Sequence, residues 1–98
     1  MIVAVHPAAE IEFWESVQFY EGEEAGVGVG FSDEVHEALM RISKHPELPR
    51  LRRDFYRRVN LKRFNHYIAY LIRDEEIRVL AISHAHRAPE HWIDRAEP

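Results

Sequence analysis

The sequence predicts an α+β fold in which a two-helix hairpin packs on a small antiparallel sheet, in the order β-α-α-β-β-β. The spacing of apolar residues changes near residue 50, from the 3.6-residue period of amphipathic helices to the two-residue period of strands. A glycine-rich stretch, 26–30, divides the helical half. A chain of 98 residues has the length of one domain, so we treat 1–98 as a single unit.

The first predicted elements are a short strand and a helix. The apolar run 1–5 predicts a strand at or near the edge of the sheet, and Pro7 suits the first turn of the helix that follows. We expect this helix from about 8 to 23. Its apolar stripe consists of Ala9, Phe13, Val17 and Tyr20. The glutamates are expected on the opposite face, and Glu10 and Glu12 lie in the first turn, where the helix dipole favours negative charge.

A second helix is predicted from Gly28 or Phe31 to about His45, where Pro46 stops it. Its apolar stripe consists of Phe31, Val35, Leu39 and Ile42. The glycines of 26–30 permit a sharp reversal of the chain, so the two helices are expected to form an antiparallel hairpin.

Three strands are predicted beyond residue 49, joined by short turns into an antiparallel meander. Val59 and Leu61 alternate with polar residues in the first of them. The run 67–72 is continuous in apolar residues and 77–84 contains the apolar run 79–82, so these two strands are expected at the centre of the sheet, under the helices.

The two tryptophans are interpreted as structural. Trp14 is expected to cover the seam between helix and sheet, because it lies on the first helix next to the apolar stripe. Trp92 follows the last strand and is expected to cap the open end of the core.

Charge is spread unevenly along the chain, although the net charge is only −4. Residues 1–47 carry ten acids and two bases, and the remaining residues carry seven acids and eleven bases. Such asymmetry is informative about partners and not about the fold. The absence of cysteine excludes disulfides and Cys-type zinc sites. Without a signal-like or membrane-spanning run, a cytoplasmic protein with no membrane contact is expected.

The densest basic stretch could form a partner-binding surface. Its bases are Arg50, Arg52, Arg53, Arg57, Arg58, Lys62 and Arg63, with Phe55, Tyr56 and Phe64 among them. Three interpretations stay open: a solvated strand face, a surface for an acidic protein, and a site for single-stranded nucleic acid. A pI near 5.9 argues against strong RNA binding, so no direct sequence-specific binding of nucleic acid is expected.

Three of the seven histidines lie close together in the sequence. His84 and His86 are two residues apart on a predicted strand and share a face. With His91 they could supply three nitrogens to zinc, but this spacing matches no known zinc pattern. We therefore expect no metal site. The glycine stretch 26–30 lacks the lysine of a phosphate-binding loop, so no cofactor is expected either.

Several short segments together resemble the RelE/ParE superfamily of toxins. In chain order they are His6-Pro7, Phe19-Tyr20-Glu21, Gly28-Val29-Gly30-Phe31, Arg63-Phe64-Asn65-His66-Tyr67-Ile68-Ala69-Tyr70, Ser83-His84 and Arg87-Ala88-Pro89-Glu90-His91-Trp92. The resemblance spans about 6 to 95 and implies the same fold as the periodicity. It implies the toxin of a type II toxin–antitoxin pair, of the plasmid stabilisation type, held inactive by a cognate antitoxin. RelE-like members cut mRNA on the ribosome, whereas ParE-like members poison DNA gyrase.

The resemblance also implies which positions would act on a phosphate in RelE-like members, and this chain departs from them. The lysine positions fall near Val59 and Leu61, and an arginine position falls near Ile68. The last-strand arginine is replaced by His86, and the C-terminal tyrosine by Trp92. Apolar side chains cannot stabilise phosphate charge, and tryptophan has no proton to exchange at useful pH. Cleavage by the usual mechanism is therefore not expected.

Two functional hypotheses follow from the resemblance. The first is a ParE-like toxin that binds an essential target of the gyrase type, with an acidic or amphipathic antitoxin segment against the basic residues Arg50, Arg52, Arg53, Arg57, Arg58 and Lys62. The alternative is a ribosome-dependent mRNA endonuclease with a rearranged site. The candidate residues for that site are Arg63, His84, His86, Arg87 and His91. Whether the chain is an enzyme stays open at this point.

Overall fold

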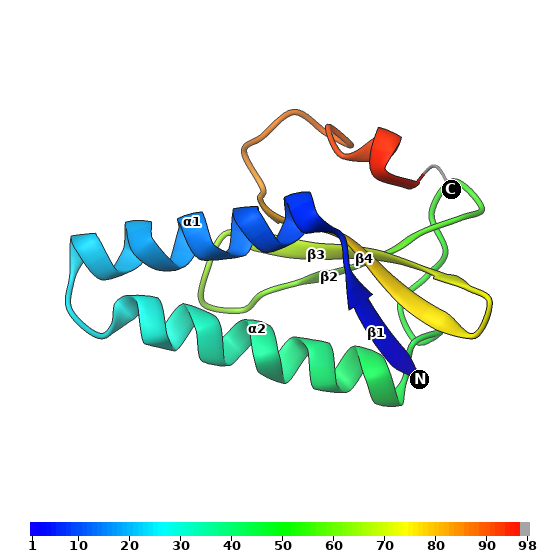
Figure 1. Cartoon of the computed structure of the whole chain (residues 1–98), viewed down its shortest axis with the longest axis horizontal. Coiled ribbons are helices and arrows are strands. Elements are labelled where there is room, and N and C mark those ends of the chain that lie inside the picture. Colours follow the sequence, from blue (N-terminus) through cyan, green and yellow to red (C-terminus); the bar gives the residue numbers. More distant parts are fainter. Residues whose placement is uncertain (97–98) are drawn as a thin grey trace.

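The computed structural model describes residues 1–96 and contains the predicted order of elements. Those elements are β1 (Ile2–Val5), α1 (Pro7–Glu23), α2 (Val27–Lys44), β2 (Arg57–Asn60), β3 (His66–Arg73), β4 (Glu76–His84) and a short 3₁₀ helix, η1 (Ile93–Ala96). The predicted α+β class and the β-α-α-β-β-β order are confirmed (Figure 1).

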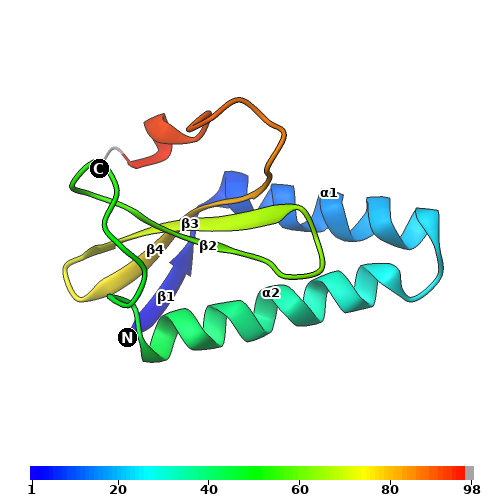
Figure 2. The ribbon, with the colours of Figure 1, turned by 180° about the vertical axis from the view of Figure 1, so that it is seen from behind.

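The sheet has the strand order β1-β4-β3-β2. Strands β2, β3 and β4 form the predicted antiparallel meander, and β3 and β4 are central, as expected. Strand β1 lies at the edge and pairs with β4 in parallel, so the sheet is mixed. The helical hairpin packs on one face of the sheet, and the C-terminal segment crosses the other face (Figures 1 and 2).

Helix α1 begins close to its predicted start, and α2 begins at Val27, one residue before the earlier of its two predicted starts. The imidazole of His6 accepts a hydrogen bond from the backbone N–H of Ala8 at 3.0 Å, and Pro7 occupies the first turn. Gly26, with a φ of 90°, makes the reversal between the helices. No helix of residues 1–96 combines the length and the apolar character needed to cross a bilayer.

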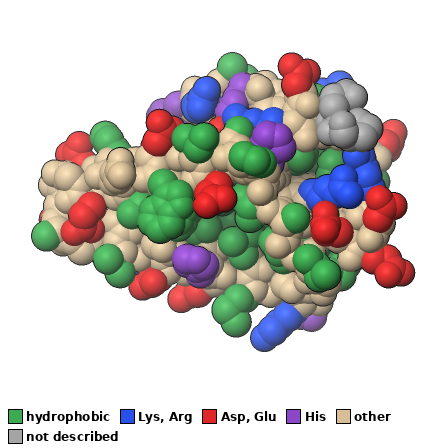
Figure 3. All heavy atoms as spheres, in the orientation of Figure 1, with side chains coloured by type: hydrophobic (Ala, Val, Ile, Leu, Met, Phe, Trp, Pro, Cys, Tyr) green, Lys and Arg blue, Asp and Glu red, His purple; other side chains and the backbone are tan. Residues whose placement is uncertain are grey.

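Two expectations about α1 are wrong. Glu12 does not point to solvent with the other glutamates; its side chain is only 7% exposed. Trp14 does not cover the helix–sheet seam, because it is 54% exposed and lies over a groove between the two helices, edge-on to Phe13. On the face shown in Figure 3, apolar side chains gather in the middle of the molecule, and the outer end of the helical hairpin carries acidic but no basic side chains.

A β-bulge in β4 decides which side chains face the helices. The register against β3 shifts between Ala69 and Tyr70, and this shift leaves Leu80 without a partner. Leu80 and Ala81 therefore both face away from the helices, and Ile82 returns to the helix side. Strict alternation from Val79 would have placed the helix-facing positions one residue earlier.

A second apolar cluster covers the sheet face opposite the helices. It consists of Tyr56, Tyr67, Ala69, Leu71, Leu80, Ala81 and Trp92. Trp92 is 1% exposed and donates a hydrogen bond from Nε1 to the Tyr67 hydroxyl at 2.8 Å. The expectation that Trp92 caps the open end of the core is therefore wrong. Trp92 anchors the C-terminal segment on the sheet face opposite the helices.

The close packing of α1 against the start of α2 gives the first testable prediction. A Cβ on Gly28 would lie 2.5 Å from the Val17 carbonyl oxygen and 2.9 Å from the Glu21 Cβ. Gly28→Ala should therefore lower the free energy of unfolding by about 1–3 kcal/mol in urea denaturation. The matched control is Gly22→Ala, where nothing lies within 4 Å and the helix should gain about 0.5–1 kcal/mol. Equal stability of both variants would contradict this helix packing.

Candidate functional site

The candidate site is built around an edge of β4 that no strand covers. Strand β1 pairs with β4 only as far as Val79, and the chain then turns into α1. The backbone of Leu80 and Ile82 is buried beyond this point and needs other partners. The Glu12 carboxylate accepts the Ile82 N–H at 3.1 Å, and the Arg95 guanidinium donates to the Leu80 carbonyl at 3.0 Å. Two side chains thus replace the missing strand.

The same two side chains bind each other. An Nη of Arg95 lies 3.0 Å from Glu12 Oε1, with side chains that are 18% and 7% exposed. Because both groups are largely buried, removal of either would leave the other charge poorly solvated. The pair therefore ties three segments together: the first turns of α1, the middle of β4 and η1.

The second carboxylate oxygen of Glu12, Oε2, has charged neighbours only at longer distances. Oε2 lies 3.7 Å from an Nη of Arg87 and 3.8 Å from His91 Nε2, and it accepts no hydrogen bond from any group in residues 1–96. Burial, and after it the charge of Arg87, lower the pKa of His91, although Glu12 opposes this. His91 is therefore mainly neutral near pH 7, and its Nε2 lies 2.8 Å from the Ser83 hydroxyl.

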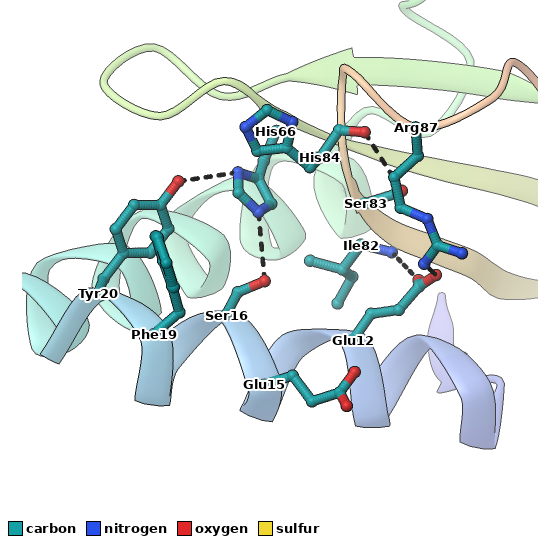
Figure 4. Close-up of a pocket in the computed structure, with 10 residues that line it drawn as sticks. All are labelled: Glu12, Glu15, Ser16, Phe19, Tyr20, His66, Ile82, Ser83, His84 and Arg87. Carbon is teal, nitrogen blue, oxygen red and sulfur yellow. Dashed lines mark hydrogen bonds and ion pairs between the residues drawn. The ribbon is translucent and has the colours of Figure 1, made fainter. Parts of the chain in front are cut away.

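A buried histidine lies one strand further into the sheet. Nε2 and Nδ1 of His66 lie 3.2 Å from the Ser16 hydroxyl and 3.4 Å from the Tyr20 hydroxyl, both on α1 (Figure 4). Burial, and then the nearby charge of His84, lower the pKa of His66 from 6.5 to about 4. His66 is therefore neutral at physiological pH, and each ring nitrogen has a hydroxyl neighbour.

These groups line an open pocket of about 220 Å³ between α1 and the end of β4. The lining residues are Glu12, Glu15, Ser16, Phe19, Tyr20, His66, Ile82, Ser83, His84 and Arg87. Figure 4 shows the two glutamates and the aromatic rings rising from α1, and the strand residues facing them from above. The β4 bulge makes this arrangement possible, because it turns Ile82 and His84 toward α1.

Four of the five predicted enzymatic candidates lie together here. The rings of His84 and His86 are 4.7 Å apart, and those of His84 and His66 are 5.0 Å apart. Arg87 and His91 both lie near Oε2 of Glu12, which lines the same pocket as His84.

Arg63 lies apart from the other four candidates. It binds Glu34 and the Gly30 carbonyl on α2. Burial raises the pKa of Glu34, but the backbone N–H groups of Lys62 and Arg63 and the Arg63 guanidinium offset this, so the pKa is lowered overall.

The predicted basic surface is divided among several structural contacts. Arg57 donates to the carbonyls of Glu47 and Pro49, and Arg53 pairs with Glu90 of the C-terminal segment. The Arg58 guanidinium lies 3.9 Å from the centre of the Tyr67 ring. Arg50 and Lys62 are exposed, and Arg52 is half-buried beside Tyr56.

The positions that the family resemblance assigns to phosphate chemistry are occupied mainly by core residues. Ile68 is fully buried and Leu61 is 7% exposed, and both belong to the helix-side core, against which Val59 packs. Trp92 is buried on the opposite face of the sheet. His86 alone is exposed, with its Nε2 3.1 Å from Nδ2 of Asn65.

Sequence reasoning missed four polar members of the site: Glu12, Ser16, His66 and Arg95. The signal for Glu12 and Ser16 was present, since Glu12 lies three residues after Ala9 and Ser16 four residues before Tyr20, at the spacing of the apolar stripe. Within residues 1–96, no three His, Asp or Glu side chains are arranged to hold a metal ion.

The buried imidazole of His66 predicts a loss of stability in acid. The unfolded chain takes up a proton near pH 6.5 and the folded chain only near pH 4, so stability is full above pH 6.5 and falls as the pH drops toward 4. Between about pH 7.5 and pH 5 this contributes a loss of about 2 kcal/mol in urea denaturation. His66→Gln should remove most of this pH dependence, and the exposed control His36→Gln should retain it. The same pH dependence in the His66 variant would contradict the assignment.

A comparison with protein-family models gives one match. Residues 3–89 match the family described as the ParE toxin of the type II toxin–antitoxin system parDE. The match begins in β1, covers both helices and all four strands, and ends within the C-terminal segment, before Trp92. A comparison with curated proteins finds no match.

Proposed function

Since this chain belongs to the ParE toxin family of type II toxin–antitoxin systems, we propose that it inhibits growth by binding a protein target of the DNA gyrase type and not by cutting mRNA. Family membership makes it the toxin of such a pair, with a cognate antitoxin as its partner. A gyrase-type target would place its action in the cytoplasm.

The strongest support for a mechanism without RNA cleavage is the burial of the positions that would act on a phosphate. Phosphoryl transfer needs cationic groups around the developing negative charge and a group that exchanges protons. Ile68 and Leu61 lie in the apolar core, and the indole of Trp92 is already bound to Tyr67. Restoring a cationic set there would require charges to be buried at high cost.

The alternative, an mRNA endonuclease with a rearranged site, draws on the grouping of His84, His86, Arg87 and His91 at the end of β4. The electrostatics of the adjoining pocket argue against it. Glu12 and Glu15 line the pocket and would repel a phosphate, and the low pKa of His66 keeps that ring uncharged. The group offers bases but only one permanent cation, Arg87, which lies near the Glu12 carboxylate, whereas a scissile phosphate requires several cations around it.

For the antitoxin we propose the surface formed by β2 and the loop before it. Arg50, Arg52, Arg58 and Lys62 remain accessible or half-accessible there, whereas Arg53 and Arg57 are engaged within the chain. A pocket on the helix side of β2 is lined by Arg41, Ile42, His45, Leu48, Pro49 and Val59, whereas Arg58 lies on the other side of the strand, over Tyr67. An amphipathic segment with acidic residues would match both the apolar groove and the bases.

The proposal predicts that toxicity survives loss of His84, His86 and Arg87 at the end of β4. The triple variant His84→Ala, His86→Ala, Arg87→Ala should arrest growth to within about threefold of the unchanged toxin, because target binding does not need these groups as acids or bases. The purified toxin should inhibit gyrase supercoiling and leave ribosome-bound mRNA intact. Circular dichroism of the variant controls for folding. Loss of arrest in a folded variant, together with mRNA cleavage by the unchanged toxin, would establish the endonuclease alternative.

A further inference from the structure

We propose that the pocket between α1 and the end of β4 binds the arginine side chain of a protein partner, with Glu12 Oε2 as the acceptor of its guanidinium. The inference rests on the proposed function only in that the partner is a protein. It concerns a site distinct from the surface suggested above for the antitoxin.

The first argument is the unequal use of the two oxygens of Glu12. Oε1 is engaged in the structure, since it accepts a hydrogen bond from the Ile82 N–H at 3.1 Å and forms an ion pair with Arg95 at 3.0 Å. Oε2 accepts no hydrogen bond within residues 1–96, although the side chain is 93% buried (7% exposed) and lines the pocket. A buried carboxylate oxygen without a donor costs free energy. A ligand that supplies N–H groups would remove this cost.

The second argument is the charge of the pocket. Its ionised side chains are Glu12, Glu15 and Arg87, and His66 stays neutral. Arg95 and Arg87 both approach Glu12, whereas Glu15 forms no ion pair within residues 1–96, so a further positive charge would balance Glu15. The surrounding surface has the same preference, because α1 contains five glutamates and no lysine or arginine. A cationic ligand is therefore attracted, and a polyanion such as RNA is repelled.

The third argument is the shape of the pocket. About 220 Å³ is below the usual range for pockets that hold drug-sized molecules and suits a single side chain. Phe19 is 60% exposed at the pocket, edge-on to Tyr20 with their ring centres 5.3 Å apart (Figure 4). A guanidinium stacks on aromatic faces and binds carboxylates through a planar fork of donors, which favours arginine over a simple ammonium group. The aliphatic stem would lie against Ile82.

Arg87 of the chain itself does not already fill this role. Its guanidinium is 3.7 Å from Oε2, beyond hydrogen-bond range, and its side chain is 57% exposed. The ion pair is therefore weak, and a partner's arginine could enter beside it or displace it.

The test is an NMR titration of the isotope-labelled protein with blocked arginine amide. We expect saturable shifts of the Ile82, Ser83 and His84 amides, with an affinity at least tenfold higher than for blocked citrulline amide, which has the same shape without the charge. Blocked norleucine amide, which keeps only the aliphatic stem, should bind at least as weakly as citrulline. Guanosine monophosphate tests the nucleotide alternative and should cause no shifts in the pocket.

Glu12→Gln should weaken arginine binding at least tenfold, because it replaces the Oε2 acceptor with an amide donor. Glu23→Gln, at the exposed end of α1, removes the same charge outside the pocket and should leave affinity within twofold. Equal binding of arginine and citrulline, shifts spread over other surfaces, or pocket binding of the nucleotide would each overturn the proposal. If Glu12→Gln does not fold, the comparison of arginine amide with citrulline amide on the unchanged protein still tests the proposal. Since the assay involves neither gyrase nor growth, its failure would leave the proposed function standing.

Discussion

The edge of β4 beyond Val79 is the constraint on which the functional end of the molecule depends. Strand β1 leaves the sheet there, because the chain must turn at His6 to start α1. The buried backbone of Leu80 and Ile82 would be unpaired without Glu12 and Arg95. These two residues come from opposite ends of the chain, so their pairing fixes how α1 and the C-terminal segment lie on the same strand.

The two faces of the sheet are joined through this edge. On the helix side, the position of Glu12 sets the wall of the pocket next to His66 and Ile82. On the other side, Arg95 continues from the segment that Trp92 anchors on Tyr67. A buried ion pair therefore joins the C-terminal segment to the wall of the pocket.

Periodicity alone predicted the helical hairpin, the meander and the central position of β3 and β4, because those features follow from which residues repeat every 3.6 or every two positions. It could not predict the bulge at Leu80, because 79–82 is apolar throughout and alternation gives no register there. Periodicity also could not predict which face of the sheet Trp92 covers, because its hydrogen bond to the Tyr67 hydroxyl joins residues that lie far apart in the sequence. Glu12 was wrongly placed on the solvent-facing side of α1, because it was grouped with the other glutamates although it lies three residues after Ala9 of the apolar stripe.

The central claim is that the Glu12–Arg95 pair substitutes for a strand and couples α1 to η1. A double-mutant cycle with Glu12→Gln and Arg95→Met tests it most directly, because glutamine keeps an acceptor for the Ile82 N–H while removing the charge. The free energies of unfolding from urea denaturation of the four proteins should give a coupling energy of about 1–3 kcal/mol. Additive effects of the two substitutions, within about 0.5 kcal/mol, would contradict the account.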